Sequence, residues 1–218
     1  WENGINIPII TDNLEKTAKK NNLLLKNALK ELKKAKNQLL SEREKRTRPG
    51  LDDKILTSWN ALMLNGYVDA YRTFNENAFL DKAIENAKFI LKNLKKTDGR
   101  LDRNYKNGQS SINGFLDDYA NTINAFINLY QATFDEKWLN EAQLLTEYVQ
   151  THFFDYETGL FFYTSDIDKA LIARKMEISD NVIPASNSVM AKNLHQLGHF
   201  LYRNNYIKMA ENMLLSNK

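Results

Sequence analysis

Two pairs of adjacent aspartates stand where the sequence predicts that helices begin. Asp52 and Asp53 precede one helical pattern, and Asp117 and Asp118 open another. Neighbouring carboxylates can act as proton donor and acceptor when their surroundings separate their pKa values, so these four are the candidate catalytic residues. Asp is also favoured at helix N-caps, where its side chain accepts backbone N–H groups. One cap uses one side chain, so the second carboxylate of each pair is left for a site.

The residues around these aspartates are of kinds that bind a polyol. Aromatic rings can stack on the apolar face of a sugar, while amide, hydroxyl and ammonium groups can hold its hydroxyls. The candidate substrate-binding residues are Lys54, Trp59, Asn60, Tyr119, Asp180, Asn181, Asn187 and Ser188. Each has a structural alternative, because Trp59 and Tyr119 fall on apolar helical stripes typical of a core, and Asn187 and Ser188 can cap a helix after Pro184.

The histidines and the lack of cysteine limit the cofactor chemistry. His195 and His199 are four residues apart and share a helix face, but the sequence supplies no clear third metal ligand and no zinc-protease motif. With no Cys there is no thiol nucleophile within these residues. A phosphate-binding loop and a dinucleotide fingerprint are also absent. We therefore expect neither a metal nor a cofactor.

Apolar residues at spacings of three and four predict the helices that position these groups. One helix covers 59–74, with Thr57 or Ser58 as its N-cap, and a second covers 79–94. A short polar link at 75–77 makes the two an antiparallel hairpin.

The hairpin pattern occurs three times. Leu80 corresponds to Leu139, and Leu139 corresponds to Ile207. The links within hairpins are short (75–77, 135–137 and 204–205), whereas those between hairpins are long (96–114 and 153–184). In such a bundle all long links lie at one end, beside the starts of the first helix of each hairpin. We expect a functional site on that loop-rich face, where helix N-termini favour polar or anionic ligands.

Turn residues inside the long links predict small β-hairpins. Asp98-Gly99 and Thr158-Gly159 are turn formers, and the strand-like segment 160–163 follows the second.

Composition and charge exclude several classes of protein. Hydrophobic residues make up 43%, with only 8 Gly and 3 Pro, which disfavours disordered, collagenous and turn-rich all-β chains. No apolar run approaches the ~20 residues of a membrane span. Residues 19–48 are strongly basic, but the apolar positions among them form one helical stripe, which favours a solvated basic face over a nucleic-acid site. That stripe is Leu25, Ala28, Leu29, Leu32, Ala35 and Leu39. We expect no nucleic-acid and no membrane partner.

Three segments carry a resemblance to a known family. They read KRTRPGLDDKILTSWNALM at 45–63, GFLDDYA at 114–120 and SDNVIPASNS at 179–188. In this order they resemble thioredoxin-domain-containing proteins whose carboxy-terminal region is similar to N-acylglucosamine 2-epimerase. The resemblance implies an all-α fold of consecutive antiparallel helical hairpins, part of an (α/α)6 toroid like those of sugar epimerases and several glycoside hydrolases. The chain departs from the family at Ala61 and Ala185-Ser186, where relatives have Gly and Ser-Gly.

The same resemblance implies that the chain is a fragment of a longer protein. We expect 1–218 to be a single domain, a partial toroid with leading helices and a basic linker at 1–50 and three helical hairpins at 51–218. The parent's thioredoxin-like domain and further hairpins are absent from it. Three hairpins cannot close a ring, so exposed apolar edges favour self-association or contact with the missing parts of the parent chain. We expect a cytoplasmic location.

Two functions fit these observations. The first is a sugar-binding or sugar-processing funnel, in which Asp52 or Asp53 faces Asp117 or Asp118 and the ligand is a small sugar-like molecule. No His lies at a helix start, which favours hydrolysis over an epimerisation that uses His. The alternative is a non-catalytic binding or interaction module that serves the parent's thioredoxin-like domain.

Overall fold

The computed structural model describes residues 9–169 and 172–215, which form two compact units that meet in sequence between Asp52 and Asp53. The first contains α1 (Leu14–Lys20) and α2 (Leu25–Glu44), which pack against each other. Of the apolar stripe predicted along α2, Ala28 is buried, whereas Leu29 and Leu39 stay more than half exposed. The single domain expected over 1–218 remains a prediction. Among the described residues no helix is both long and apolar enough to cross a membrane.

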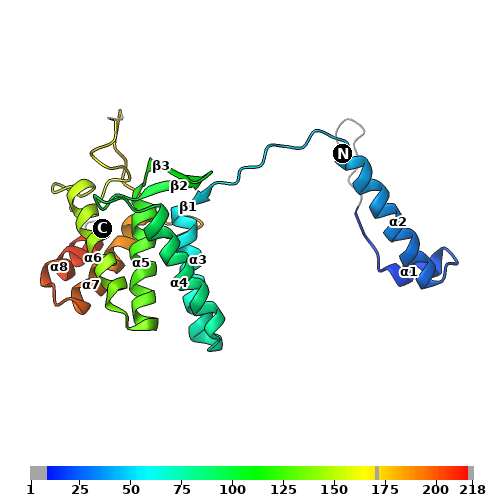
Figure 1. The fold of residues 1–218 in the computed structure, drawn as a ribbon, viewed down its shortest axis with the longest axis horizontal. Helices are drawn as coiled ribbons and strands as arrows, with labels where there is room; N and C mark the ends of the chain where they lie inside the picture. The colour runs from blue at the N-terminus through cyan, green and yellow to red at the C-terminus, as the bar shows by residue number, and fades with distance from the viewer. Residues whose placement is uncertain (1–8, 170–171, 216–218) are drawn as a thin grey trace. The chain divides into compact units, whose positions relative to one another are not determined.

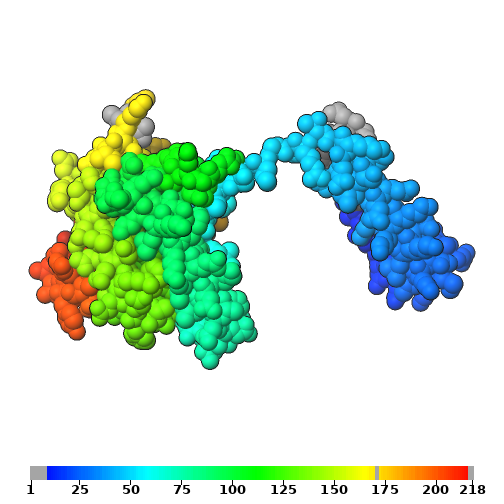
Figure 2. Space-filling view, in the orientation of Figure 1, coloured from blue at the N-terminus to red at the C-terminus, as the bar shows by residue number. Residues whose placement is uncertain are grey.

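The second unit is built from three antiparallel helical hairpins, as predicted (Figure 1). They pair α3 (Thr57–Phe74) with α4 (Asn77–Asn93), α5 (Leu116–Thr133) with α6 (Glu136–His152), and α7 (Ser186–Phe200) with α8 (Asn204–Leu215). The first helices form a row, because α5 packs against both α3 and α7. In the space-filling view the surface of this unit passes from teal through green to red, so the hairpins lie beside one another in chain order (Figure 2).

The links inside the hairpins are as short as predicted, because left-handed residues end two of the first helices. Asn75 and Phe134 have φ values of 56° and 54°, and each donates its backbone N–H to a carbonyl of the last helical turn. The predicted N-caps of α3 are wrong. Thr57 and Ser58 are buried within the first turn, and the capping position is Leu56. The Thr57 hydroxyl instead donates to the Asp102 carbonyl at 2.6 Å, which ties α3 to the neighbouring sheet.

The long link 96–114 contains the predicted β-hairpin, but its turn lies elsewhere. Strands β2 (Asp102–Lys106) and β3 (Gln109–Asn113) pair antiparallel, and β1 (Ile55–Leu56) adds a third strand in the order β1-β2-β3. The two-residue turn is Asn107-Gly108, both with positive φ, as a primed hairpin turn requires. Asp98-Gly99 makes an earlier turn closed by an isolated bridge between Lys95 and Leu101.

The strand predicted at 160–163 is reduced to a single bridge. Phe161 pairs with Phe154 across the turn at Thr158-Gly159, and no regular strand is assigned in the described part of this link. The hydrogen bonds of Phe161 go to a side chain rather than to a ladder partner. The small β-hairpin predicted here is therefore present only as this one bridge.

Aromatic side chains fill the core between the hairpins. The largest fully buried ones are Trp138, Tyr119, Phe126, Phe153 and Phe161. Phe153 and Phe161 belong to the first part of the long link after α6, so this part of the link is anchored in the core. That anchoring fixes where its polar residues lie.

Candidate functional site

The long links meet the first turns of α3, α5 and α7, as the hairpin geometry predicts (Figure 1). The Leu116 N–H at the start of α5 donates to the Tyr163 carbonyl at 2.9 Å, and the Ser186 N–H at the start of α7 donates to Glu177 Oε2 at 2.9 Å. These bonds satisfy N–H groups that a helix start leaves unpaired. They bring the link 153–184 to the starts of α5 and α7, while the bond from Thr57 to the Asp102 carbonyl brings the link 96–114 to the start of α3.

Asp118 joins the first turns of two neighbouring helices. Its Oδ1 accepts the Ser58 N–H of α3 at 2.9 Å, and its Oδ2 accepts the Phe115 N–H at 3.0 Å. Arg103 of β2 also donates to Oδ2, at 2.9 Å. The side chain is fully buried. These are the bonds of a capping residue, the structural alternative left open by the sequence, and they leave neither oxygen of Asp118 for a ligand.

Burial and the adjacent charge of Asp117 raise the pKa of Asp118 to about 6, although Arg103 and the two backbone N–H groups act in the opposite direction. Removing a carboxylate from water disfavours its charged form, and a second carboxylate beside it adds repulsion. The folded chain therefore holds a proton at Asp118 more tightly than the unfolded chain does.

This shift predicts how stability depends on pH. Because the folded pKa is above the unfolded one, the contribution of Asp118 is complete below about pH 4 and is lost as the pH rises through about 6. We expect the free energy of unfolding to fall by on the order of 2–3 kcal/mol across that window. Urea unfolding of wild type and Asp118→Asn at several pH values tests this. Parallel pH profiles for the two proteins would contradict it.

Asp117 has a different environment from its neighbour. Its Oδ1 accepts hydrogen bonds from Arg103 Nη1 at 3.2 Å and from the Tyr163 hydroxyl at 3.1 Å. Its Oδ2 receives no hydrogen bond from any described residue and is not among the buried polar atoms that lack a partner. Asp117 therefore has one oxygen fixed by the protein, and because its side chain is 14% exposed, the other oxygen keeps some access to the surroundings.

Tyr119, the third residue of this segment, belongs to the core. Its ring stacks on Tyr148 with centroids 5.4 Å apart, and its hydroxyl accepts the Leu101 N–H at 2.8 Å. Burial raises the pKa of the Tyr119 hydroxyl. The core alternative stated for Tyr119 describes it better than the stacking one, because a fully buried ring has no face for a ligand.

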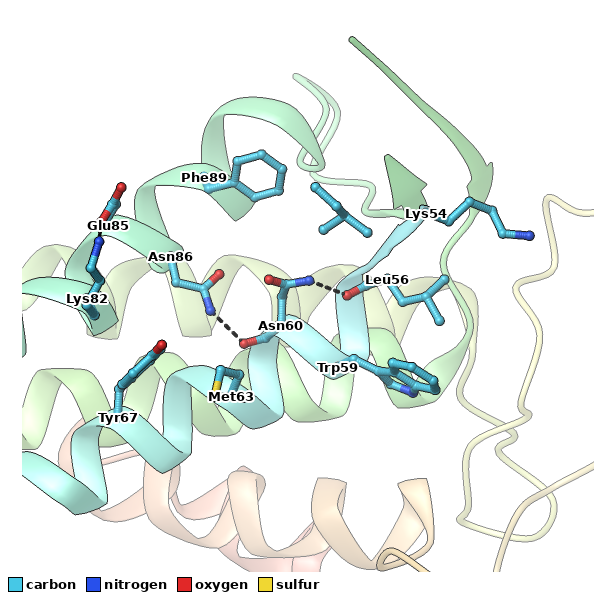
Figure 3. A pocket seen from close by; sticks show the side chains of 11 residues that line it. Lys54, Leu56, Trp59, Asn60, Met63, Tyr67, Lys82, Glu85, Asn86 and Phe89 are labelled. Atoms are coloured by element: carbon cyan, nitrogen blue, oxygen red, sulfur yellow. Dashed lines mark hydrogen bonds and ion pairs between the residues drawn. The ribbon is translucent and has the colours of Figure 1, made fainter. Parts of the chain in front are cut away.

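Three of the predicted binding residues line one pocket of about 480 Å³ between α3 and α4 (Figure 3). Lys54, Trp59 and Asn60 contribute to it, beside apolar neighbours such as Met63 and Phe89. Trp59 is 69% exposed, so the core alternative does not apply to it. Trp59 follows Ser58, whose N–H donates to Asp118. The first turn of α3 therefore both lines the pocket and contacts the aspartate pair Asp117 and Asp118 of α5.

Asparagines fix the shape of this pocket. Asn60 donates its side-chain amide to the Leu56 carbonyl at 2.9 Å, and Asn86 of α4 donates to the Asn60 carbonyl at 2.9 Å. Figure 3 shows the Asn86 bond crossing from α4 to α3 and the Asn60 bond lying within the start of α3, with the Lys82–Glu85 ion pair to one side and Trp59 to the other. The pocket thus combines an aromatic face with amide and charged groups.

The predicted residues at the start of α7 are mainly structural. Asn187 is buried: its Oδ1 accepts the Phe161 N–H, and its Nδ2 donates to the carbonyls of Phe161 and Glu177, all at 2.9 Å. Asp180 Oδ1 accepts the Ala185 N–H at 2.7 Å and the hydroxyl of exposed Ser188 at 3.3 Å.

Asn181 and Asp53 of the first aspartate pair have contacts outside the start of α7. The Asn181 N–H donates to the Ile183 carbonyl at 3.1 Å in an exposed loop. Asp53 pairs with Lys106 at 2.5 Å, and this hydrogen bond holds the pKa of Asp53 below its ordinary value. Asp52 is the last residue of the first unit. The expected approach of Asp52 or Asp53 to Asp117 or Asp118 remains a prediction.

The described residues contain no group of three His, Asp or Glu side chains that could hold a metal ion. His195 and His199 do share a face of α7, with ring centroids 4.6 Å apart. His152, in the last turn of α6, is 2.8 Å from Asp166.

Sequence reasoning missed Arg103, Tyr163 and Glu177. Tyr163 lies 46 residues from Asp117, and Arg103 lies 14 residues before it. No periodicity or motif links residues at such separations, since the contacts arise only when the links fold back onto the helix starts. A single Arg within a predicted β-hairpin gave no local signal of its role.

Comparison with known proteins agrees with this architecture. No family model matches the chain. It is 30% identical over 210 residues to an uncharacterized protein of Caenorhabditis elegans, covering 93% of this chain and 28% of that protein. It is 29% identical over 207 residues to spermatogenesis-associated protein 20 of Homo sapiens, covering 90% of this chain and 26% of that protein. The chain thus spans about a quarter of the length of these relatives.

Solved structures share the hairpin arrangement. A GH76 alpha-mannanase of Bacteroides thetaiotaomicron matches with a TM-score of 0.63 and 18% identity, over 78% of this chain and 46% of that one. Cellobiose 2-epimerase of Bacillus thermoamylovorans matches with a TM-score of 0.63 and 16% identity, over 74% and 44%. An unsaturated glucuronyl hydrolase specific for heparin matches with a TM-score of 0.62 and 16% identity, over 78% and 48%.

These likenesses define the class of fold: the second unit is part of an α/α toroid, as the sequence predicted. In sequence the chain is similar to spermatogenesis-associated protein 20. At these identities the solved structures establish the fold alone.

Proposed function

We propose that this chain supplies one part of a carbohydrate site on the loop-rich face of an α/α toroid, centred on Asp117 and Trp59. The proposal draws on the fold, because the similar solved structures are a mannanase, an epimerase and a glucuronyl hydrolase. The chain matches less than half of each of them. The remaining wall of the site would therefore come from other parts of a longer protein.

The observation that carries the proposal is the state of the Asp117 carboxylate. Arg103 and Tyr163 hold one oxygen, while the other is left open. An ionised carboxylate oxygen is a strong acceptor for hydroxyl donors. Trp59, in the first turn of α3, offers an exposed ring that can stack on the apolar face of a sugar.

If the toroid is catalytic, Asp117 is the candidate proton-transfer residue of this chain. Asp118 has both oxygens engaged, so a second catalytic carboxylate would be a different residue, for which Asp53 is the candidate within the same unit. A glycosidase pair works at separations of about 5–10 Å. Hydrolysis is the proposed class of reaction.

The buried state of Asp118 favours the second candidate function, a non-catalytic module that binds a ligand for a thioredoxin-like domain of the longer protein. Asp117→Asn in that longer protein separates the two functions. Loss of sugar turnover with ligand binding retained supports the enzyme. Binding without turnover of any sugar in a broad screen, in the unaltered protein, supports the module.

Trp59→Ala tests the carbohydrate site itself. Loss of a stacking face costs about 1–1.5 kcal/mol, so we expect sugar affinity to fall about tenfold while the melting temperature changes little, because the ring is largely exposed. Calorimetric titration with neutral mono- and oligosaccharides measures the affinity. Phe74→Ala, at the far end of α3 and 64% exposed, is the matched control and should bind as wild type does. Equal affinities for wild type and Trp59→Ala would contradict the proposal.

A further inference from the structure

Tyr163 attaches the link between the second and third hairpins to the start of α5. Its carbonyl accepts the Leu116 N–H at 2.9 Å, and its own N–H donates to the Lys175 carbonyl at 2.7 Å. Its hydroxyl donates to Asp117 Oδ1 at 3.1 Å, and its ring lies 5.2 Å from that of Phe115. Backbone and side chain together therefore place one hydroxyl on one carboxylate oxygen.

Arg103 reaches the same oxygen from the other long link. Its Nη1 lies 3.2 Å from Asp117 Oδ1 and 2.9 Å from Asp118 Oδ2, and its guanidinium lies 4.5 Å from the centroid of the Phe115 ring. The Phe115 ring thus contacts both Arg103 and Tyr163. Because two donors converge on Oδ1, rotation of the Asp117 carboxylate is restricted, and Oδ2 is the oxygen that accepts no hydrogen bond from a described residue.

The charges around this carboxylate bear on the ligand. Asp117 and Asp118 carry two carboxylates against the single guanidinium of Arg103, which is already bound to both. Burial raises the pKa of the Tyr163 hydroxyl, as do the neighbouring charges of Asp117 and Glu177, so it remains a neutral donor at physiological pH. A ligand carboxylate or phosphate would meet like charge here, whereas a neutral hydroxyl would donate to Asp117.

We propose that Tyr163 and Arg103 are positioning residues that hold Asp117 for a neutral sugar, selecting hydroxyl donors over anionic sugars such as uronic acids. This inference rests on the proposed function. It assigns the two long links a shared task, because each contributes one donor to the same oxygen. Neither residue needs to touch the ligand.

Tyr163→Phe removes the donor and keeps the ring against Phe115. The variant loses one hydrogen bond to a charged group, so we expect affinity for a neutral sugar to fall about fivefold to tenfold, which corresponds to about 1–1.4 kcal/mol. The carboxyl ¹³C shift of Asp117 at fixed pH should move as well. Tyr105→Phe is the control, because Tyr105 on β2 is half-buried, its ring contacts Phe89, and its hydroxyl makes no hydrogen bond with any described residue. It should leave both affinity and shift unchanged.

The possible results distinguish the positioning role of Tyr163 and Arg103 from the proposed carbohydrate-binding function. If wild type binds no sugar but Tyr163→Phe still moves the Asp117 resonance, the proposed function fails and the positioning role stands. An unmoved Asp117 resonance, or a fall in melting temperature that accounts for the whole loss of affinity, overturns the positioning role. Tighter binding of glucuronate than of glucose overturns the selection of neutral ligands. Arg103→Lys, which keeps the charge, should retain more affinity than Arg103→Ala.

Discussion

Asp118→Ala is expected to lower the free energy of unfolding at pH 7 by about 2–4 kcal/mol, with a fall in melting temperature on the order of 5–15 °C. The substitution leaves the N–H groups of Ser58 and Phe115 without their acceptor in a buried position. Unsatisfied buried donors cost about 1–3 kcal/mol each, and relief of the buried charge offsets part of that cost. Denaturant unfolding measures the change.

Asp53→Ala is the matched control for this prediction. Asp53 is also an aspartate of the predicted site, but its carboxylate is half exposed and pairs with Lys106 at the surface. Surface ion pairs contribute little, so its removal should hardly change stability. Equal effects of the two substitutions would mean that the hydrogen bonds from Ser58 and Phe115 to Asp118 do not stabilise the fold.

Asn187→Ala is expected to destabilise the chain by about 2–4 kcal/mol for a related reason. Asn187 supplies both hydrogen bonds of the Phe161 backbone, and Phe161 is fully buried. Without them the segment around Phe161 loses its bonds to α7, although the Ser186 N–H still binds Glu177 of the same link. Thermal unfolding gives the change in stability, and faster amide exchange at Phe161 would locate it.

The neighbouring Ser188→Ala separates attachment from a general sensitivity of the α7 start. Ser188 is exposed and makes one hydrogen bond, to Asp180 at 3.3 Å. Its replacement should alter stability by less than about 0.5 kcal/mol. A binding role for Asn187 without a structural one would instead leave the stability of Asn187→Ala unchanged and reduce only ligand affinity.

Much of the fold could be predicted because it depends on the spacing of apolar residues within short segments of the sequence. The stripes that give α3 to α8 recur at helical spacing, and short links enforce antiparallel neighbours. Details that depend on distant partners could not be predicted. Thr57 looks like an N-cap in sequence, yet its hydroxyl is used by Asp102 of β2. The aromatic segment 160–163 looks like a strand, yet a side chain of α7 takes the bonds of Phe161.

The candidate site shows the same division. Its location at the starts of α3, α5 and α7 follows from chain topology and could be predicted. The roles of single residues could not, because the two adjacent aspartates Asp117 and Asp118 differ only through their neighbours in space. Trp59 and Tyr119 both lie on apolar stripes, but the first is exposed and the second is buried. Which stripe faces a partner helix depends on the packing of the row.

The proposed carbohydrate site requires that Asp117 and Trp59 contact the same ligand. A ¹H–¹⁵N titration of the chain with neutral oligosaccharides tests this directly. We predict that the Trp59 indole N–H and the backbone amides of Leu116 and Asp117 shift together along one binding curve. Shifts confined to other surfaces, or no shifts up to the solubility limit of the sugars, would contradict it.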